Sequence, residues 1–229
     1  MSDQTAKLQW RDDLIPVSTK FDDPYFSLEH GLNETGHVFL AGNNLPDRFA
    51  PGFHIAELGF GTGLNLIAAW RAWDAAGHTT PLTFTSFEAF PMSAEEMARA
   101  LNAFPEVADY AQRLCEAWSV DQTLSTLEGI NARVILGDAR ETLSTEDWQA
   151  DAWFLDGFSP AKNPELWDEK LMSEVGKHTK AGGTAATYTA AGFVRRNLEN
   201  AGFEIERVSG FGRKRHMTIA TKPITTVSE

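Results

Sequence analysis

An acid and an aromatic residue stand together where an apolar segment of the chain ends. Ala152 to Leu155 is a short apolar run, which predicts a buried strand, and Asp156-Gly157-Phe158 follows it directly. The pair Ser159-Pro160 then predicts a turn. A carboxylate can accept N–H bonds from a flat, amine-bearing group while an aromatic ring stacks on its face. The spacing therefore predicts a site that holds an amine, and it leaves open what happens to that amine.

A second segment that could do chemistry is Glu57-Leu-Gly-Phe-Gly-Thr-Gly63, between a predicted strand and a predicted helix. Its glycines allow a tight turn in which the backbone approaches a ligand closely. A dinucleotide site would have the spacing Gly-x-Gly-x-x-Gly, with a pyrophosphate at the helix N-terminus. Here the spacing is Gly-x-Gly-x-Gly. Glu57 precedes it and would repel a pyrophosphate but suit an ammonium group, directly or through water.

This glycine segment resembles motif I of the class I S-adenosylmethionine-dependent methyltransferases, whose cofactor carries an amino acid and a sulfonium. Two further acids, Glu88 and Asp138, follow the next two predicted strands, and ligands of open α/β sheets bind beyond such strand ends. By the resemblance, Glu88 would accept the ribose hydroxyls, and Asp138 the adenine amino group with the Ala139 backbone nearby. A dinucleotide site and a purely structural turn stay as alternatives. The expected cofactor contacts are Glu57, Gly59, Gly61, Thr62, Gly63, Glu88, Asp138, Ala139 and Asp156.

From about residue 54 onward, strand-like and helix-like segments alternate, which predicts an α/β fold with a mostly parallel sheet covered by helices on both faces. Strands are expected at 54–58, 82–87, 132–136, 152–155 and 183–189, and the segments 203–208 and 217–221 form a closing antiparallel pair. Helices are expected at 64–75, 93–104, 106–118, 168–177 and 192–200, with one or two further turns at 121–128.

The first 50 residues do not follow this alternation. They carry a turn-rich segment at 21–26 and a short helix near 34–40. We therefore expect an N-terminal extension over residues 1–50, packed on the sheet or its ligand, and a Rossmann-like methyltransferase domain over 51–229.

Composition limits the class of protein. The chain has 229 residues, of which 42% are hydrophobic, enough for one globular core. No apolar run approaches the roughly 20 residues needed to span a membrane, and the N-terminus lacks signal-peptide features. Cys115 is the only cysteine and the histidines lack metal-ligand spacing, so we expect no disulfide and no metal. These features favour a cytoplasmic protein.

The charge is unevenly distributed along the chain. A net charge of −12 argues against general nucleic-acid affinity. However, residues 1–159 carry 9 Lys and Arg against 24 Asp and Glu, whereas residues 160–222 carry 11 against 7. Such asymmetry hints at a surface that faces a polyanion, although ordinary solvated charges would explain it equally well. The candidate basic contacts are Lys162, Arg195, Arg196, Arg213, Lys214 and Arg215.

The segment Asp156 to Pro160 also resembles the Asp/Asn-Pro-Pro-Tyr/Phe loop of amino-group methyltransferases that act on nucleobases. Because an amine attacks a methyl carbon in line, the protein mainly supplies positioning and stabilises the charge that develops on nitrogen. Asp156 would orient the amine and Phe158 would stack on the base. Trp153 and Trp167 flank this loop and could help to shape its pocket.

An ordered set of segments makes the resemblance more specific. They lie at 21–27, 31–35, 37–43, 57–63, 151–167, 188–196 and 210–215. Together they resemble the methyltransferase half of the bacterial bifunctional enzyme that completes 5-methylaminomethyl-2-thiouridine at the wobble position of tRNA. The resemblance implies methylation of 5-aminomethyl-(2-thio)uridine by S-adenosyl-L-methionine, with Asp156 and Phe158 at the acceptor and the basic residues on tRNA.

The chain departs from that family in one respect. The bifunctional enzyme has a flavin-dependent oxidase half, whereas this chain ends at Glu229 without a second glycine-rich fingerprint. We therefore expect a stand-alone methyltransferase without FAD, supplied by a separate oxidase or another upstream tRNA-modifying enzyme. Two other functions stay open. One is an N-methyltransferase of a small molecule or protein, and the other is a non-catalytic homologue that binds tRNA, a partner or a dinucleotide.

Overall fold

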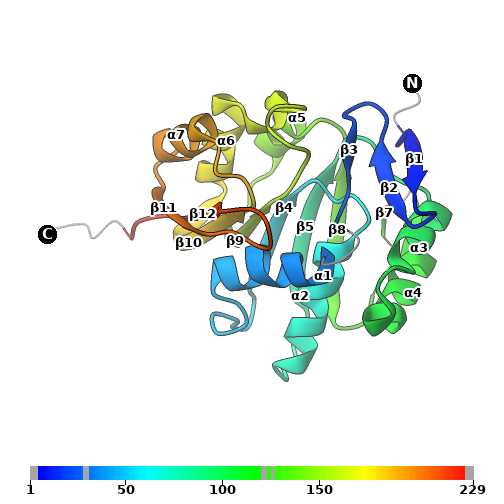
Figure 1. Cartoon of the computed structure of the whole chain (residues 1–229). Helices are drawn as coiled ribbons and strands as arrows, with labels where there is room; N and C mark the ends of the chain where they lie inside the picture. Colours follow the sequence, from blue (N-terminus) through cyan, green and yellow to red (C-terminus); the bar gives the residue numbers. More distant parts are fainter. Residues whose placement is uncertain (1–4, 28–30, 120–122, 125–126, 225–229) are drawn as a thin grey trace, which may run out of the picture.

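A seven-stranded sheet runs through the centre of the computed structural model, which describes residues 5–27, 31–119, 123–124 and 127–224 (Figure 1). The strand order is β11-β12-β10-β9-β4-β5-β8. Neighbouring strands pair in parallel except at β12, which is antiparallel to both β10 and β11. The bounds are β4 (His54–Leu58), β5 (Leu82–Glu88), β8 (Ile130–Leu136), β9 (Ala150–Leu155), β10 (Thr179–Thr187), β11 (Glu204–Ser209) and β12 (His216–Thr221). The predicted sheet with an antiparallel final strand is confirmed.

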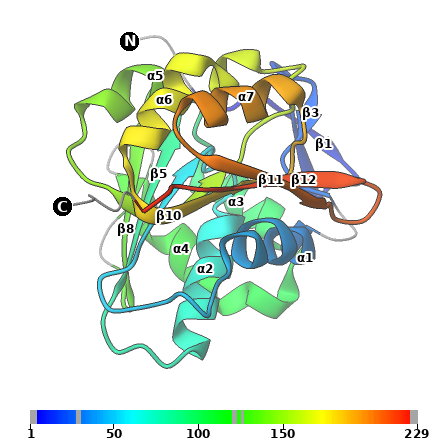
Figure 2. The same ribbon diagram turned by 90° about the vertical axis from the view of Figure 1, so that its left-hand side faces the viewer.

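The central strands are apolar because both faces of the sheet are covered. All five residues of β4 are buried, as are Ala152 to Leu155 of β9. Figure 2 shows one layer of helices on each side of the sheet. One layer contains α2 (Leu64–Ala75), α3 (Ala94–Leu101) and α4 (Ala108–Ala117), and the other contains α5 (Ala139–Thr142), α6 (Glu169–Lys177) and α7 (Gly192–Asn200). The buried side chains form two corresponding clusters, one on each face.

Most of the predicted helices are found, with shifts at their ends. The helix α2 begins and ends as predicted, and α3 begins after Ser93, whose side chain forms a capping box with Glu96. Before α6, the Asp168 carboxylate accepts the backbone N–H of Leu171 at 2.7 Å, which caps that helix. A short 3-10 turn, η3 (Pro105–Val107), precedes α4.

The prediction of helical turns at 121–128 is wrong for the residues that the structure describes there. Thr123–Leu124 forms β7, which pairs antiparallel with β6 (Trp118–Ser119), and Leu127 bridges Ile130. Residues 120–122 and 125–126 lie outside the described part. Partners across a hairpin override the weak local preference of this polar segment. The unpredicted short turns are α5, η4 (Leu143–Thr145) and η5 (Pro164–Trp167).

The N-terminal segment forms a small antiparallel sheet that sequence patterns did not predict. It contains β1 (Leu8–Arg11), β2 (Ile15–Ser18) and β3 (Asp23–Pro24), and lies beside α3 in Figure 1. The Arg99 guanidinium of α3 lies 4.0 Å from the centre of the Trp10 ring and donates to the Asp13 carbonyl, which fixes this sheet in place.

The predicted short helix near residues 34–40 is present as three consecutive turns. They are α1 (Gly31–Thr35), the π turn η1 (Gly36–Leu40) and the 3-10 turn η2 (Ala41–Asn43). Val38 and Phe39 are buried in the same cluster as α2. The domain boundary between residues 50 and 51 stays a prediction. Within the described residues, no helix has the length and apolar character that crossing a membrane requires.

Candidate functional site

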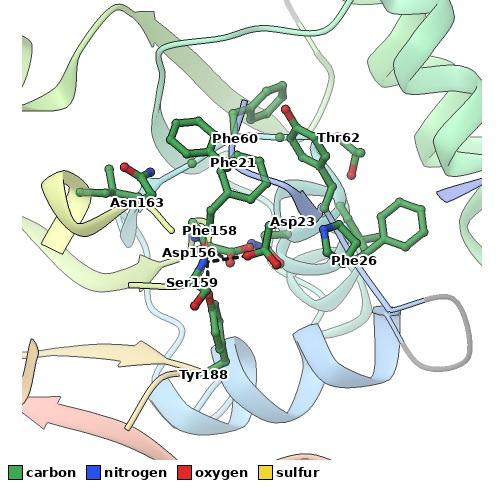
Figure 3. A pocket seen from close by; sticks show the side chains of 18 of the residues that line it. Phe21, Asp23, Phe26, Phe60, Thr62, Asp156, Phe158, Ser159, Asn163 and Tyr188 are labelled. Carbon is green, nitrogen blue, oxygen red and sulfur yellow. Dashed lines mark hydrogen bonds between the residues drawn. The ribbon is translucent and has the colours of Figure 1, made fainter. Parts of the chain in front are cut away.

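A cavity of about 1110 Å³ lies at the carboxyl ends of the parallel strands. Its walls come from the loops that follow β4, β5, β8 and β9, together with the N-terminal segment, α1 and the loop between β11 and β12. Figure 3 shows that Phe21 and Asp23 of the N-terminal segment lie beside Asp156 and Phe158 of the loop after β9. The volume suits a nucleoside-sized cofactor beside a second group.

The structure brings together many, but not all, of the predicted site residues. The cavity is lined by Gly59, Gly61, Thr62, Glu88, Asp138, Ala139, Asp156, Phe158, Arg213 and Lys214. Outside its lining lie Glu57, Gly63, Lys162, Arg195, Arg196 and Arg215. Three of the predicted acids at strand ends, Glu88, Asp138 and Asp156, therefore converge on one space, whereas Glu57 and four of the six predicted basic contacts do not line it.

The glycine loop needs its glycines for two separate reasons. Gly59 has a φ of +85° and Gly61 a φ of +55°, values that L residues with a Cβ rarely adopt. In addition, a Cβ at Gly59 would lie 2.7 Å from the carbonyl oxygen of Asp156. The glycine loop and the loop that follows β9 are thus in contact through their backbones.

Glu57 is completely buried beneath this loop and reaches the cavity only through other side chains. Its Oε2 accepts the Ser86 hydroxyl at 2.6 Å, and its Oε1 accepts the amide of Asn65 at 2.9 Å. Burial raises the pKa of Glu57 well above its usual range, against the effect of these two hydrogen bonds. In this arrangement Glu57 has no direct contact with the cavity, whereas Asn65 lines it.

The acids after β5 and β8 already have protein partners. The Glu88 carboxylate accepts the backbone N–H groups of Gly61 at 2.9 Å and Phe90 at 2.7 Å, and burial raises its pKa. Asp138 caps α5 and its carboxylate accepts hydrogen bonds from the Arg140 side chain, which lowers the pKa of Asp138. The Glu88 carboxylate also lines the cavity, so ligand hydroxyls would share it with these backbone N–H groups. At Asp138 a ligand amine would have to share the carboxylate with Arg140.

Asp156 and Phe158 lie side by side after β9, as the sequence predicts (Figure 3). Burial raises the pKa of Asp156 to about 6, although hydrogen bonds from Asn65 and the Gly157 N–H oppose the shift. The Phe158 ring stacks on Phe21 with centroids 4.7 Å apart, and Tyr25 meets it edge-on at 4.9 Å. A base that stacks on Phe158 would therefore use its other face or displace Phe21.

Asp23 is another N-terminal residue that sequence reasoning missed. It holds the loop from Asp156 to Pro160, which we call the acceptor loop. Its Oδ2 accepts the backbone N–H of Ser159 at 2.8 Å (Figure 3). Lys162 is anchored to the same segment, with Nζ 3.4 Å from Oδ1 of Asp23 and close to Asp22. The only signal for this wall in the sequence was the cluster of aromatic and acidic residues at 21–26.

Lys214 is part of the cavity wall. Its Nζ lies 2.5 Å from Oε1 of Glu34 in α1 and 4.0 Å from the centre of the Tyr188 ring. The Tyr188 hydroxyl in turn donates to the Gly157 carbonyl at 2.8 Å. The loop between β11 and β12 is thereby tied to α1 and to the acceptor loop. Among the other predicted basic contacts, Arg196, Arg213 and Arg215 are exposed, and Arg195 is half-buried on α7.

The two tryptophans beside the acceptor loop do not line the cavity. Trp153 is fully buried in the sheet and belongs to the core. Trp167 is also buried, but its indole N–H donates to the Phe158 carbonyl at 3.1 Å. Trp167 therefore supports the acceptor loop from the protein core.

Comparison with known proteins places this site in a family. Residues 105–223, more than half of the chain, match the model of a family described as S-adenosyl-L-methionine-dependent methyltransferase. The chain belongs to this family of methyltransferases. Its cofactor is therefore S-adenosyl-L-methionine, and the predicted fold class and resemblance are confirmed.

Two curated relatives match nearly the whole methyltransferase. The tRNA 5-methylaminomethyl-2-thiouridine biosynthesis bifunctional protein MnmC of Hahella chejuensis is 43% identical over 228 residues, which is 93% of this chain and 36% of that protein. The protein of the same name from Leptospira borgpetersenii is 43% identical over 220 residues, with 92% and 34% covered. The chain thus spans about a third of the length of these relatives.

A solved structure extends the likeness to three dimensions. The crystal structure of MNMC2 from Aquifex aeolicus matches with a TM-score of 0.76 and 25% identity. The match covers 99% of this methyltransferase and 74% of the other chain. The N-terminal segment that closes the cavity is therefore included in the likeness.

Proposed function

We propose that this chain transfers the methyl group of S-adenosyl-L-methionine to the amine of 5-aminomethyl-(2-thio)uridine at the wobble position of tRNA. The observation that carries the proposal is the pair Asp156 and Phe158 on the wall of the cavity that the glycine loop also lines. The names of the 43% identical relatives supply the nucleoside. A tRNA substrate implies a cytoplasmic location.

The cofactor would be held by the glycine loop and the acids at the strand ends. These residues fit the cofactor, because the Glu88 carboxylate and the glycine loop both line the cavity, where Glu88 would accept hydroxyl groups. S-adenosyl-L-methionine supplies an electrophilic methyl group when bound. Glu57 is too deeply buried to bind the cofactor directly, and would instead orient Asn65 at the cavity wall.

The acceptor residues would position the amine and stabilise its developing charge. The Asp156 carboxylate accepts an N–H of the neutral amine and turns the nitrogen lone pair toward the methyl carbon. The amine nitrogen would bond to the methyl carbon as the carbon–sulfur bond breaks, with that electron pair left on the sulfur. The new secondary ammonium then loses its proton to Asp156 or water. Phe158 and the neighbouring N-terminal aromatic rings hold the base.

We place the tRNA contacts at the exposed loop between β11 and β12, on the rim of the cavity. Replacing Arg213, Lys214 and Arg215 together by Ser should weaken tRNA binding and flatten its salt dependence by about one unit of slope for each phosphate that is no longer neutralised. Affinity for S-adenosyl-L-methionine should stay within about threefold, because the strand-end acids are unchanged. Filter binding at several salt concentrations measures the first effect, and calorimetry measures the second.

A matched control removes three other exposed cations. Lys7, Arg71 and Lys177 are exposed and do not line the cavity, so their triple Ser variant changes the net charge equally. We expect it to keep most of the tRNA affinity. An equal decrease of affinity in both triple variants would mean that only overall charge matters, and it would remove the loop from the tRNA interface.

A second candidate function is N-methylation of a small molecule. It is favoured by the net charge of −12 and by the ion pairs that hold Lys162 and Lys214 within the protein. Comparing kcat/KM for tRNA that carries 5-aminomethyluridine with kcat/KM for the free nucleoside separates the two functions. We expect tRNA to be preferred by about a hundredfold or more, which corresponds to roughly 3 kcal/mol. Equal values would favour the small-molecule function.

A further inference from the structure

Asn65, in the first turn of α2, connects the two acids that lie at the ends of β4 and β9. Its amide nitrogen is 2.9 Å from Oε1 of Glu57 and 2.8 Å from Oδ2 of Asp156. The Thr35 hydroxyl of α1 donates to its Oδ1 at 2.9 Å. One side chain therefore joins three separate elements at the cavity wall.

The chemistry of the partners leaves this amide a single orientation. Above about pH 6 the Asp156 carboxylate is ionised and only accepts hydrogen bonds, so the NH₂ group of Asn65, which also meets Glu57, must face it. The carbonyl oxygen then faces the hydroxyl of Thr35, which can donate. Asn65 and Thr35 are each about 5% exposed, and buried networks with every partner satisfied are rigid.

Both oxygens of Asp156 are held in this network. Oδ2 accepts the Asn65 amide, and Oδ1 accepts the backbone N–H of Gly157 at 2.9 Å. Each oxygen keeps a further acceptor position. On the basis of the proposed function, we propose that Asn65 is a positioning residue for methyl transfer. It holds the Asp156 carboxylate in the orientation that accepts the substrate amine, and Thr35 holds Asn65.

Several charged or titratable groups face Asp156 from the surrounding elements. Glu34 of α1 raises its pKa and Lys214 of the β11–β12 loop lowers it, while Glu57 of β4 and Tyr188 after β10 are the other neighbours in electrostatic contact. Burial is the largest influence and raises the pKa, and the hydrogen bond from Asn65 is the main one that opposes it. Removal of the Asn65 donor should therefore raise the pKa of Asp156 further, so that a higher pH is needed to ionise it.

The test is the pH profile of methyl transfer for Asn65→Leu and for the milder Thr35→Val. Asn65→Leu should lower kcat/KM about tenfold at about pH 5, for a shift of one unit in the acid limb, and much less at pH 9. Thr35→Val should lower kcat/KM at the same low pH by about threefold. Affinity for S-adenosyl-L-methionine should stay within about threefold of the wild type in both variants.

Thr179→Val is the matched control. Thr179 is buried like Thr35 and its hydroxyl donates to the Val175 carbonyl at 2.6 Å, but it begins β10, at the far end of the sheet from the cavity. We expect a similar decrease of stability from both threonine variants and a wild-type pH profile only for Thr179→Val. A wild-type profile for Asn65→Leu and Thr35→Val would overturn the proposal. Cofactor affinity that falls as much as the rate would also overturn it.

A readout that needs no substrate separates this proposal from the proposed function. The Asp156 carboxyl can be titrated by ¹³C NMR in protein with labelled aspartate, with Asp156→Asn to assign the signal. An upward shift in Thr35→Val supports the role of Asn65 even if the wild type fails to methylate tRNA, a failure that would count against the proposed function alone. An unchanged titration in an active enzyme would overturn the Asn65 proposal alone.

Discussion

Asp156→Asn should lower kcat for methyl transfer about 10² to 10⁴-fold, the range typical of removing a group that takes part in proton transfer and charge stabilisation. The substitution keeps the shape of the side chain but removes the negative charge next to the reacting nitrogen. The Asn65 amide donates to Oδ2 of Asp156 at 2.8 Å, so in the variant it would face the amide of the new asparagine. Single-turnover rates with saturating tRNA measure the effect.

The proposed role of Asp156 also predicts that activity decreases as the pH falls. Burial raises the pKa of Asp156 to about 6, so below that pH the carboxyl is protonated and loses the negative charge that stabilises the developing ammonium. Ionisation of Asp156 should raise the wild-type rate about tenfold per pH unit below 6, in addition to the effect of deprotonating the substrate amine, and above pH 6 only the amine should matter. The limb near pH 6 should be absent from the residual activity of Asp156→Asn.

Glu165→Gln is a suitable control, because this exposed acid also lines the cavity. It should keep nearly full activity, and both variants should bind S-adenosyl-L-methionine within about threefold of the wild type. Full activity in Asp156→Asn would rule out the acceptor site. A decrease of cofactor affinity that matches the decrease of rate would assign Asp156 to the cofactor instead.

Gly59→Ala should destabilise the fold by about 3 kcal/mol or more and abolish cofactor binding. A φ of +85° strains any residue with a Cβ, and the new methyl group would lie 2.7 Å from the Asp156 carbonyl oxygen. Because that oxygen belongs to the backbone after a buried strand, the glycine loop must move away and the cavity changes shape. Urea unfolding and calorimetry with S-adenosyl-L-methionine measure the two effects.

Gly77→Ala separates backbone strain from the close contact. Gly77 has a φ of +76°, and a Cβ there would meet nothing within 4 Å. It should cost about 1 kcal/mol and leave cofactor affinity unchanged. If Gly59→Ala cost no more than Gly77→Ala and still bound the cofactor, the tight passage between the two loops would have no functional role.

The fold could be predicted from the sequence because its signals are local. The apolar run Ala152 to Leu155 ends at Asp156, and the periodic segment 64–75 follows a glycine loop, so strand ends and helix starts were visible in short windows. The small N-terminal sheet and β7 were missed because their strands have only two to four residues. Such short strands are stabilised by their partners rather than by their own pattern.

The missed parts of the site depend on contacts between residues far apart in the chain. Asn65 meets Asp156 across 91 positions, and Asp23 meets Ser159 across 136. Lys214 looked like a free tRNA contact, yet it pairs with Glu34 at a separation of 180. No local pattern encodes these pairs. A polar residue in the otherwise apolar first turn of α2 was the one available sign of Asn65, since buried amides need partners.

The central claim is tested most directly by the identity of the methylated product. The protein is incubated with S-adenosyl-L-methionine that carries a CD₃ group and with tRNA from a strain that lacks this modification, and the tRNA nucleosides are then analysed by mass spectrometry. We predict that the label appears in 5-methylaminomethyl-(2-thio)uridine, on the side-chain nitrogen, at the wobble position. Label on another nucleoside, or on a ring atom or ribose of the same uridine, would contradict the account.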